Sequence, residues 1–253
     1  MAPRDVLADI RRDICRENQA RLAFTRRAFR ALHGLRKPRI LDVGCGTGGP
    51  TLELAKLSDG EIVAMDIDQT ALDELQRTAG EAGVSARITV VNRSMLDMDF
   101  VEECFDVVWS EGAVLAIGFS EALEEWRKFI RPGGFLVIHE AIWLRPDPPE
   151  EIASYWHRMY PAMRTASHHI EEIRRFGYEL VDCFPLPEDA WWVDYYEPLE
   201  QRIRGLQDDR SDPEVQRLIA DQQREIDLYK RSRKWYGSAF FIMHKSKTGV
   251  RRT

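Results

Sequence analysis

Apolar residues recur along this chain with two different spacings, and segments with one spacing alternate with segments that have the other. Short continuous apolar runs predict buried strands, and each run is followed by a stretch with apolar residues three or four positions apart, which predicts a helix. Between residues 38 and 142 this order repeats, which indicates a parallel sheet with helices on both faces. The predicted strands are residues 40–43, 62–68, 88–91, 105–110 and 135–138.

The regions on either side of this alternation complete the predicted architecture. Residues 3–32 carry the pattern of one or two amphipathic helices. After the proline-rich segment 145–149, the pattern predicts helices over 150–160 and 167–176 and strands over 178–184 and 236–244. We expect an α/β fold with a doubly wound, mostly parallel seven-stranded sheet. Its parts would be an N-terminal helical cap (1–35), a Rossmann-like core (36–184 and 236–247) and an insert (185–235).

The insert is longer than a connection between two neighbouring strands requires. Helices are predicted near 195–206 and 212–233, and Ser211-Asp212-Pro213 suits the start of the second one, with proline in the first turn. Long insertions in compact domains are usually functional. We interpret the insert as a substrate lid, and a dimerisation arm or a plain helical decoration remains an alternative of nearly equal weight.

The first predicted strand ends in a glycine-rich turn, Gly44-Cys45-Gly46-Thr47-Gly48-Gly49, with a helical pattern directly behind it. Such a turn brings bare backbone close to a ligand and aims helix N–H groups at it. Gly44, Gly46 and Gly49 also fit the G-x-G-x-x-G pattern of dinucleotide sites. Asp42 argues against that interpretation, because this strand end is normally apolar in a dinucleotide fingerprint.

Further segments follow the turn in a fixed order. A second strand ends at Asp66, about 20 residues past the glycines, where a carboxylate can reach ribose hydroxyls. A third strand precedes Ser94, a fourth precedes Glu111, and an Arg131-Pro132-Gly133-Gly134 turn leads into the fifth. Together with residues 41–48, these segments resemble the class I S-adenosylmethionine-dependent methyltransferases, small-molecule type, over roughly residues 38–142.

The resemblance implies S-adenosyl-L-methionine as cofactor and S-adenosyl-L-homocysteine as product. It implies that Asp66 holds both ribose oxygens, and that the last strand inserts antiparallel between the fifth and sixth. Ser94 stands where the family usually has an aspartate that contacts the adenine amine, so a hydroxyl beside the N–H of Met95 would serve here. The expected cofactor-binding residues are Asp42, Gly44, Gly46, Thr47, Gly48, Asp66, Ile67, Ser94, Met95 and Glu111.

Composition and charge fit an enzyme acting on a small molecule. The net charge is −6, and the basic run 230–234 suits the solvated end of a helix. Nucleic acid is therefore an improbable partner, since phosphate contacts need clustered positive charge. No segment has the length and apolarity of a membrane span or the pattern of a signal peptide. The four cysteines are scattered along the chain, which favours reduced thiols and a cytoplasmic location. We expect the protein to be a monomer or a homodimer.

Substrate-side residues should follow the fourth and fifth strands, because ligands bind beyond the carboxyl ends of parallel strands. Glu111 and His139 are the catalytic candidates; for His139, a structural role is the stronger alternative, and Glu140 points to the other side of its strand. His168-His169 lacks further ligands at metal spacing, so no metal is expected. The candidate pocket residues are Trp143, Tyr160, Trp191, Trp192 and Tyr195, for which a hydrophobic hinge is at least as good an interpretation.

The sequence thus predicts transfer of a methyl group to a small molecule, with a slight preference for a nitrogen acceptor over oxygen. That preference rests on Glu111 and on the aromatic residues, which could surround an ammonium group. Three alternatives stay open. They are a protein methyltransferase that docks its partner on residues 185–235, an NAD-type oxidoreductase, and a non-catalytic protein that binds the cofactor.

Overall fold

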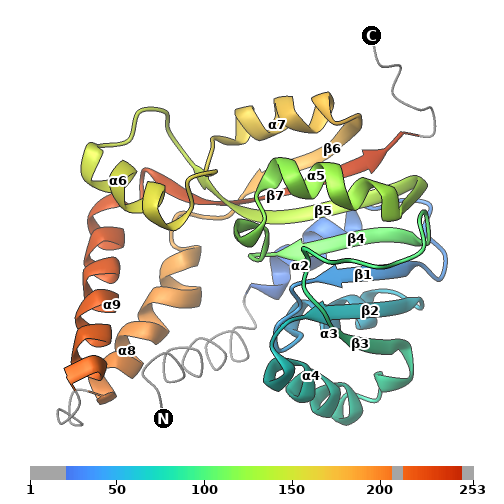
Figure 1. The fold of residues 1–253 in the computed structure, drawn as a ribbon, viewed down its shortest axis with the longest axis horizontal. Coiled ribbons are helices and arrows are strands. Elements are labelled where there is room, and N and C mark those ends of the chain that lie inside the picture. Colours follow the sequence, from blue (N-terminus) through green and yellow to red (C-terminus); the bar gives the residue numbers. More distant parts are fainter. Residues whose placement is uncertain (1–20, 207–212, 247–253) are drawn as a thin grey trace.

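Seven strands form one sheet in the order β3-β2-β1-β4-β5-β7-β6. The computed structural model of the chain describes residues 21–206 and 213–246 (Figure 1). β1 to β5 pair in parallel, and β7 is antiparallel to both of its neighbours, β5 and β6. The predicted fold class is therefore confirmed, including the antiparallel last strand. The strands are β1 (Arg39–Val43), β2 (Glu61–Asp66), β3 (Ile88–Asn92), β4 (Phe105–Glu111), β5 (Ile130–Trp143), β6 (Tyr178–Pro185) and β7 (Tyr236–Lys245).

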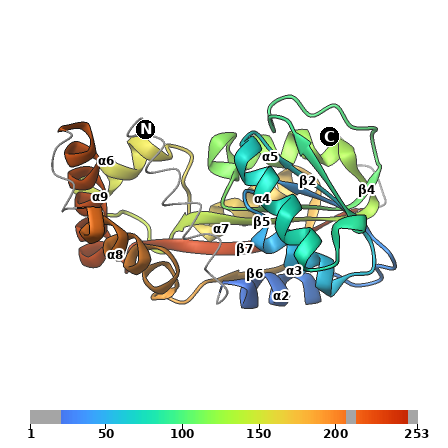
Figure 2. The same ribbon diagram turned by 90° about the horizontal axis from the view of Figure 1, so that it is seen from below.

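Helices cover both faces of the sheet, because side chains of successive strand residues point to opposite faces. On one face, Leu136 and Ile138 of β5 belong to a buried cluster with α5 (Phe119–Trp126) and α7 (Ala166–Arg175). On the other, Val137 belongs to a cluster with α2 (Leu22–Arg30) and α3 (Gly49–Leu57). α4 (Gln69–Glu81) packs on β2 and β3 through Leu72 and Leu75. Figure 2 shows α2 and α5 on opposite sides of the sheet.

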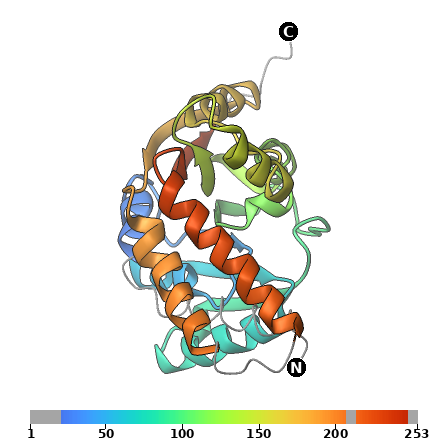
Figure 3. The same cartoon turned by 90° about the vertical axis from the view of Figure 1, so that its left-hand side faces the viewer.

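A helical lobe lies beyond the carboxyl ends of the parallel strands (Figures 1 and 3). It consists of α6 (Glu150–Met159), α8 (Glu197–Leu206) and α9 (Pro213–Ser232). β5 and β7 are the longest strands, and their far ends reach this lobe, where Trp143 pairs with Tyr236. The lobe has its own buried cluster, which includes Tyr196, Leu199 and Tyr229. The insert therefore stands at the sheet edge where a doubly wound fold binds its ligand.

The predicted helices differ from the observed ones mainly at their ends. A π-helical turn over Trp192–Tyr196 precedes α8, so the regular helix begins at Glu197. α5 is followed directly by a 3₁₀ turn over Arg127–Phe129. Residues 1–20 and the start of the predicted helix 212–233 lie outside the described residues, but α9 does have proline in its first turn.

The described part of the N-terminal segment packs against the core. α2 lies flat on the sheet, and its Ala28 is fully buried against strand residues. The domain boundaries inferred from the sequence otherwise stay predictions. Among the helices of residues 21–206 and 213–246, none combines the length and apolarity needed to cross a membrane.

Candidate cofactor site and its surroundings

The glycine loop between β1 and α3 is fixed to the neighbouring strand. The N–H groups of Gly44 and Cys45 both donate to the carbonyl of Met65 in β2, at 2.8 and 3.1 Å. Gly44 has φ +72°, and a Cβ there would overlap that of Ala113, which follows β4. Gly46 has φ +53°, and a Cβ built on it would meet no atom within 4 Å. The backbone at Gly46 therefore faces open space, as a loop that receives a ligand requires.

Asp66 ends β2 directly opposite this loop. One oxygen of its carboxylate accepts from the N–H of Gly46 at 2.8 Å, and the other accepts from the N–H of Asp68 at 2.9 Å. Ile67, the next residue, leaves 72% of its surface exposed, which is unusual for a large apolar side chain. The side chain of Asn92 at the end of β3 donates to the carbonyl of Ile67 at 3.1 Å. The structure thus brings together a carboxylate, an open glycine backbone and an exposed apolar side chain at one edge.

Three further predicted cofactor residues lie near this edge. Thr47 is half-buried in the loop, and Met95 reaches to within 3.6 Å of the position where a Cβ on Gly44 would stand. The hydroxyl of Ser94 accepts from the N–H of Leu96 at 3.1 Å, which closes a short turn after β3. The contacts of these three residues with a cofactor stay predictions.

Asp42 has different surroundings from those expected of a cofactor ligand. Its side chain is buried, and the hydroxyl of Thr51 in α3 donates to its carboxylate at 2.6 Å. Burial raises the pKa of Asp42 to about 7 although the hydrogen bond from Thr51 opposes this shift, and the charges of Glu111 and Asp66 add to the rise. The carboxyl group of Asp42 therefore links β1 to α3 through a buried hydrogen bond. Sequence analysis did not predict this interaction with Thr51.

Glu111 ends β4 and faces α2. Its carboxylate accepts from the hydroxyl of Thr25 and from the indole N–H of Trp109, both at 2.9 Å. The Nε atom of Arg21 lies 4.0 Å away. Burial raises the pKa of Glu111, and the charge of Arg21 and the two hydrogen bonds act against this rise. The helix after β4, α5, begins at Phe119 with Gly118 as its N-cap, and no side chain caps it.

His139 shares this network, and its geometry favours the structural role over that of a general base. Nη2 of Arg21 lies 2.8 Å from Nδ1 of His139. A guanidinium group can only donate, so Nδ1 must accept, and the neutral imidazole then carries its proton on Nε2. Burial, together with the charge of Arg21, holds the pKa of His139 well below its usual range. The imidazole stacks on the ring of Phe240, with ring centres 4.7 Å apart, and a catalytic role for His139 stays a prediction.

The aromatic residues of the insert form a packed core instead of an open cage. Trp191 donates its indole N–H to Ser238 of β7 at 2.7 Å and stacks on Tyr229 at 6.3 Å. Tyr195 packs edge-on against Tyr196 at 5.1 Å, and Lys230 lies 4.9 Å over the ring of Trp192. This packing favours the alternative of a hydrophobic hinge, and a pocket role for Trp191, Trp192 and Tyr195 stays a prediction.

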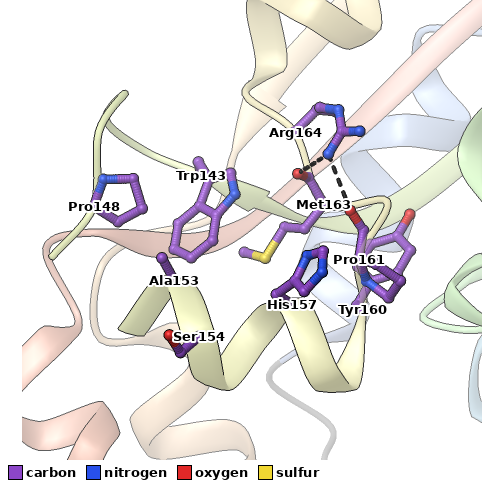
Figure 4. A pocket seen from close by; sticks show the side chains of 9 residues that line it. All are labelled: Trp143, Pro148, Ala153, Ser154, His157, Tyr160, Pro161, Met163 and Arg164. Carbon is purple, nitrogen blue, oxygen red and sulfur yellow. Dashed lines mark hydrogen bonds between the residues drawn. The ribbon is translucent and has the colours of Figure 1, made fainter. Parts of the chain in front are cut away.

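Trp143 and Tyr160 do line a hollow, as predicted for pocket residues. It measures about 420 Å³ and lies between the end of β5 and α6 (Figure 4). Arg164 closes one side, where its Nη1 donates to the carbonyls of Pro161 and Met163, each at 3.0 Å. No residue of the glycine loop is among those that line this hollow. The lining residues are Trp143, Pro148, Ala153, Ser154, His157, Tyr160, Pro161, Met163 and Arg164.

The part of the chain that the structure describes holds no group of three or more residues able to ligate a metal. His169 pairs with Glu172 at 2.9 Å and packs on Phe119, with ring centres 4.0 Å apart. Burial lowers the pKa of His169 to about 4, so this pair stabilises α7 against α5. His168 and His169 are thus placed on a helix, as the sequence suggested, although His169 is buried.

Comparisons with known proteins agree with this fold and site. Residues 40–134 match the family described as "Methyltransferase domain". A sterol 24-C-methyltransferase of Neurospora crassa is 27% identical over 185 residues, which are 69% of this chain and 48% of that protein. The chain spans about half the length, or less, of the curated relatives it matches.

Two solved structures have the same fold. A methyltransferase from Geobacter sulfurreducens in complex with S-adenosyl-L-homocysteine has a TM-score of 0.75 at 22% identity, over 87% of this chain and 89% of that one. The [4+2]-cyclase SpnF has a TM-score of 0.73 at 21% identity, over 89% and 82% of the two chains. Residues 40–134 therefore match a methyltransferase-domain family, and the molecule shares the Rossmann-like fold of these two solved structures.

Proposed function

We propose that this protein transfers a methyl group from S-adenosyl-L-methionine to a small molecule. The observation that carries this proposal is the arrangement at the end of β2, where the Asp66 carboxylate faces the open backbone at Gly46 beside exposed Ile67. A doubly wound sheet binds its ligand at this edge. The methyltransferase-domain match over residues 40–134 supports the same reaction.

The residues at this edge fit the chemical groups of the cofactor. Asp66 uses one lone pair on each oxygen for the loop N–H groups, so each oxygen has further capacity to accept from a ribose hydroxyl. Ile67 and Met95 offer apolar contact for an adenine ring. The bound cofactor supplies an electrophilic methyl group, and the protein contributes binding and orientation.

A carbon acceptor has more support than the nitrogen acceptor favoured by the sequence. Several of the matching relatives are named sterol 24-C-methyltransferases, a name that describes methylation of a carbon atom. The two features behind the nitrogen preference do not form an ammonium pocket, because Glu111 is buried under α2 and the aromatic rings of the insert pack on one another. We therefore propose an apolar small molecule with a carbon acceptor as the substrate class.

The alternative functions inferred from the sequence are outcomes of the titration described below. The cyclase with this fold illustrates that the fold alone does not fix the reaction. Docking of a protein on residues 185–235, and binding of a dinucleotide, have no specific observation in their favour. The lid role of the insert, the oligomeric state and the cytoplasmic location remain predictions.

Calorimetric titration with S-adenosyl-L-homocysteine, S-adenosyl-L-methionine and NAD tests the proposal. We expect the first two to bind and NAD not to bind. Asp66→Asn should weaken binding at least about tenfold, a loss of about 1.4 kcal/mol, while its amide oxygen can still accept from Gly46. Asp59→Asn, at the opposite edge of the sheet where Asp59 caps the N–H of Lys37, is the matched control. Binding of NAD alone would overturn the proposal.

A further inference from the structure

Arg21, at the start of α2, contacts two neighbouring strands at the edge where the candidate cofactor site lies. Its Nη2 donates to Nδ1 of His139 in β5 at 2.8 Å, and its Nε lies 4.0 Å from Oε2 of Glu111 at the end of β4. Glu111 and His139 are register partners, so one guanidinium group spans both strands. The side chain of Glu111 is only 3% exposed, and a buried carboxylate is costly without a nearby positive charge. Arg21 therefore joins α2 to the carboxyl edge of the sheet.

The same guanidinium group lies beside the turn that follows β4. A Cβ built on Gly112 would stand 3.4 Å from Nη2 of Arg21, and Gly112 has φ +72°. The N–H of Gly112 donates to the carbonyl of His139 at 2.9 Å. Gly112 is thus in contact with both members of the Arg21–His139 pair, and the position of its backbone depends on them.

The residues before and after Glu111 pack on the glycine loop. The Cβ of Ala113 lies 2.3 Å from the position that a Cβ on Gly44 would take, so the methyl group of Ala113 fits directly against the Gly44 backbone. On the other side of Glu111, the hydroxyl of Ser110 donates at 2.9 Å to the carbonyl of Val43, the residue before Gly44. Because protein interiors are close-packed, a shift at one end of such a series of contacts is transmitted to the other. A continuous series of contacts thus leads from α2 to the loop.

We propose that Arg21 is a positioning residue that holds the turn after β4 against the glycine loop, and thereby couples the docking of α2 to cofactor binding. This inference rests on the function proposed above, because it takes S-adenosyl-L-methionine or its product to bind at this loop. With Arg21 in place, Gly112 and Ala113 keep the backbone of Gly44 in the conformation that the ligand meets. Without it, the turn loses one of its supports, and the buried carboxylate of Glu111 loses a positive neighbour.

Arg26, further along α2, provides an internal reference. Its Nη1 donates to Oε1 of Glu53 in α3 at 2.8 Å, and the side chain of Glu53 is 7% exposed. The exposed fractions of the two arginine side chains are also similar, 31% for Arg21 and 37% for Arg26. Both ion pairs therefore hold α2 on the body of the protein, but Arg26 does so at the middle of α3 instead of at the turn after β4.

Calorimetric titration of S-adenosyl-L-homocysteine into matched variants separates positioning from general docking. Arg21→Gln should weaken binding at least about tenfold, a loss of about 1.4 kcal/mol, whereas Arg26→Gln should keep the affinity within about threefold. Urea unfolding of the same variants should show a lower midpoint in both. Arg21→Lys keeps a positive charge beside Glu111 but not the planar fork that reaches both strands, so it should recover only part of the affinity.

Hydrogen exchange gives a readout that a purely structural role would leave unchanged. Coupling between two sites is reciprocal, so ligand binding should stabilise the docking of α2 as much as docking stabilises binding. Saturating S-adenosyl-L-homocysteine should therefore slow the exchange of the amides of residues 22–30 in the wild-type protein. In Arg21→Gln this slowing should disappear, while the ligand still protects the amides of the glycine loop. Should Arg21→Gln not fold, the wild-type measurement by itself decides the question.

The outcomes distinguish this inference from the proposed function. Ligand binding to the wild-type protein without slower exchange in α2 would overturn the coupling and leave the function standing. An equal loss of affinity in Arg26→Gln would assign the effect to the docking of α2 in general, and would also overturn the role of Arg21. Absence of binding to the wild-type protein would overturn the proposed function, and this inference with it.

Discussion

At the scale of single residues, the glycine loop restricts the choice of amino acid most strongly. Gly46 combines a left-handed backbone with open space where a side chain would project, and Asp66 holds its N–H. Gly34 has a similar backbone, with φ +74° and no atom within 4 Å of a built Cβ, but it lies in the connection between α2 and β1, away from this loop. The two glycines therefore differ in what they face.

We expect Gly46→Ala and Gly34→Ala to cost the same stability, about 1–2 kcal/mol each, because each forces a left-handed conformation on a residue with a Cβ. Gly46→Ala should in addition weaken S-adenosyl-L-homocysteine binding at least about tenfold, since its methyl group occupies the space in front of the loop. Chemical denaturation and calorimetric titration measure the two effects. Equal affinity in both variants would show that the ligand does not approach Gly46.

Residue roles were predictable from the sequence only where they depend on nearby positions. Asp66 stands out because a strand end and a spacing of about 20 residues place it opposite the glycines. The sequence left two roles open for His139, because its tautomer depends on Arg21, which is 118 positions away in the sequence. Glu140 was judged only by strand alternation, which gives its side of the sheet but not its burial.

At the scale of elements, the insert shows what a helical pattern can and cannot predict. Both helices of the insert follow from apolar spacing, and the structure has them as α8 and α9. The role of the aromatic residues depends on which neighbours they meet, and only packing decides that. Trp191 meets Tyr229, Tyr236 and Ser238, so it joins the insert to β7.

We expect Trp191→Phe to lower the free energy of unfolding by about 1–3 kcal/mol, through lost packing and the lost hydrogen bond to Ser238. Its affinity for S-adenosyl-L-homocysteine should change less than about threefold, or roughly 0.7 kcal/mol. Trp192→Phe, at a half-exposed neighbouring position, should cost less stability. Urea unfolding and titration calorimetry provide both numbers, and an unchanged stability of Trp191→Phe would mean that this ring is not part of the lobe's core.

At the scale of the whole molecule, the order of strands was the most predictable property. Alternating strand and helix patterns restrict the connections to a parallel sheet, and the resemblance supplied the antiparallel last strand. Stability as a function of pH was not predictable, because it depends on which carboxylates folding buries. Asp42 is such a group, with a pKa of about 7 in the folded protein against an ordinary value of 3.8.

Between these two pKa values the folded protein binds more protons than the unfolded chain, so this residue makes stability fall as pH rises from about 4 to about 7. Asp42→Asn removes this pH-dependent loss of folding stability, and its amide oxygen can still accept the hydrogen bond from the hydroxyl of Thr51. We expect the variant to be more stable than wild type at pH 8, by up to about 4 kcal/mol, with a small difference at pH 4. Urea unfolding at both pH values measures this, and a less stable variant at pH 8 would show that the charged carboxylate is favoured in the fold.

The place of β7 between β5 and β6 has a consequence for synthesis on the ribosome. Every backbone pairing that joins β6 to the sheet runs through β7, and β7 starts only at Tyr236. Until those residues leave the exit tunnel, β6 has no strand beside it and the apolar edge of β5 is unpaired. Nascent chains that stop before Tyr236 therefore present an open sheet edge, which is a site for aggregation and for chaperone binding.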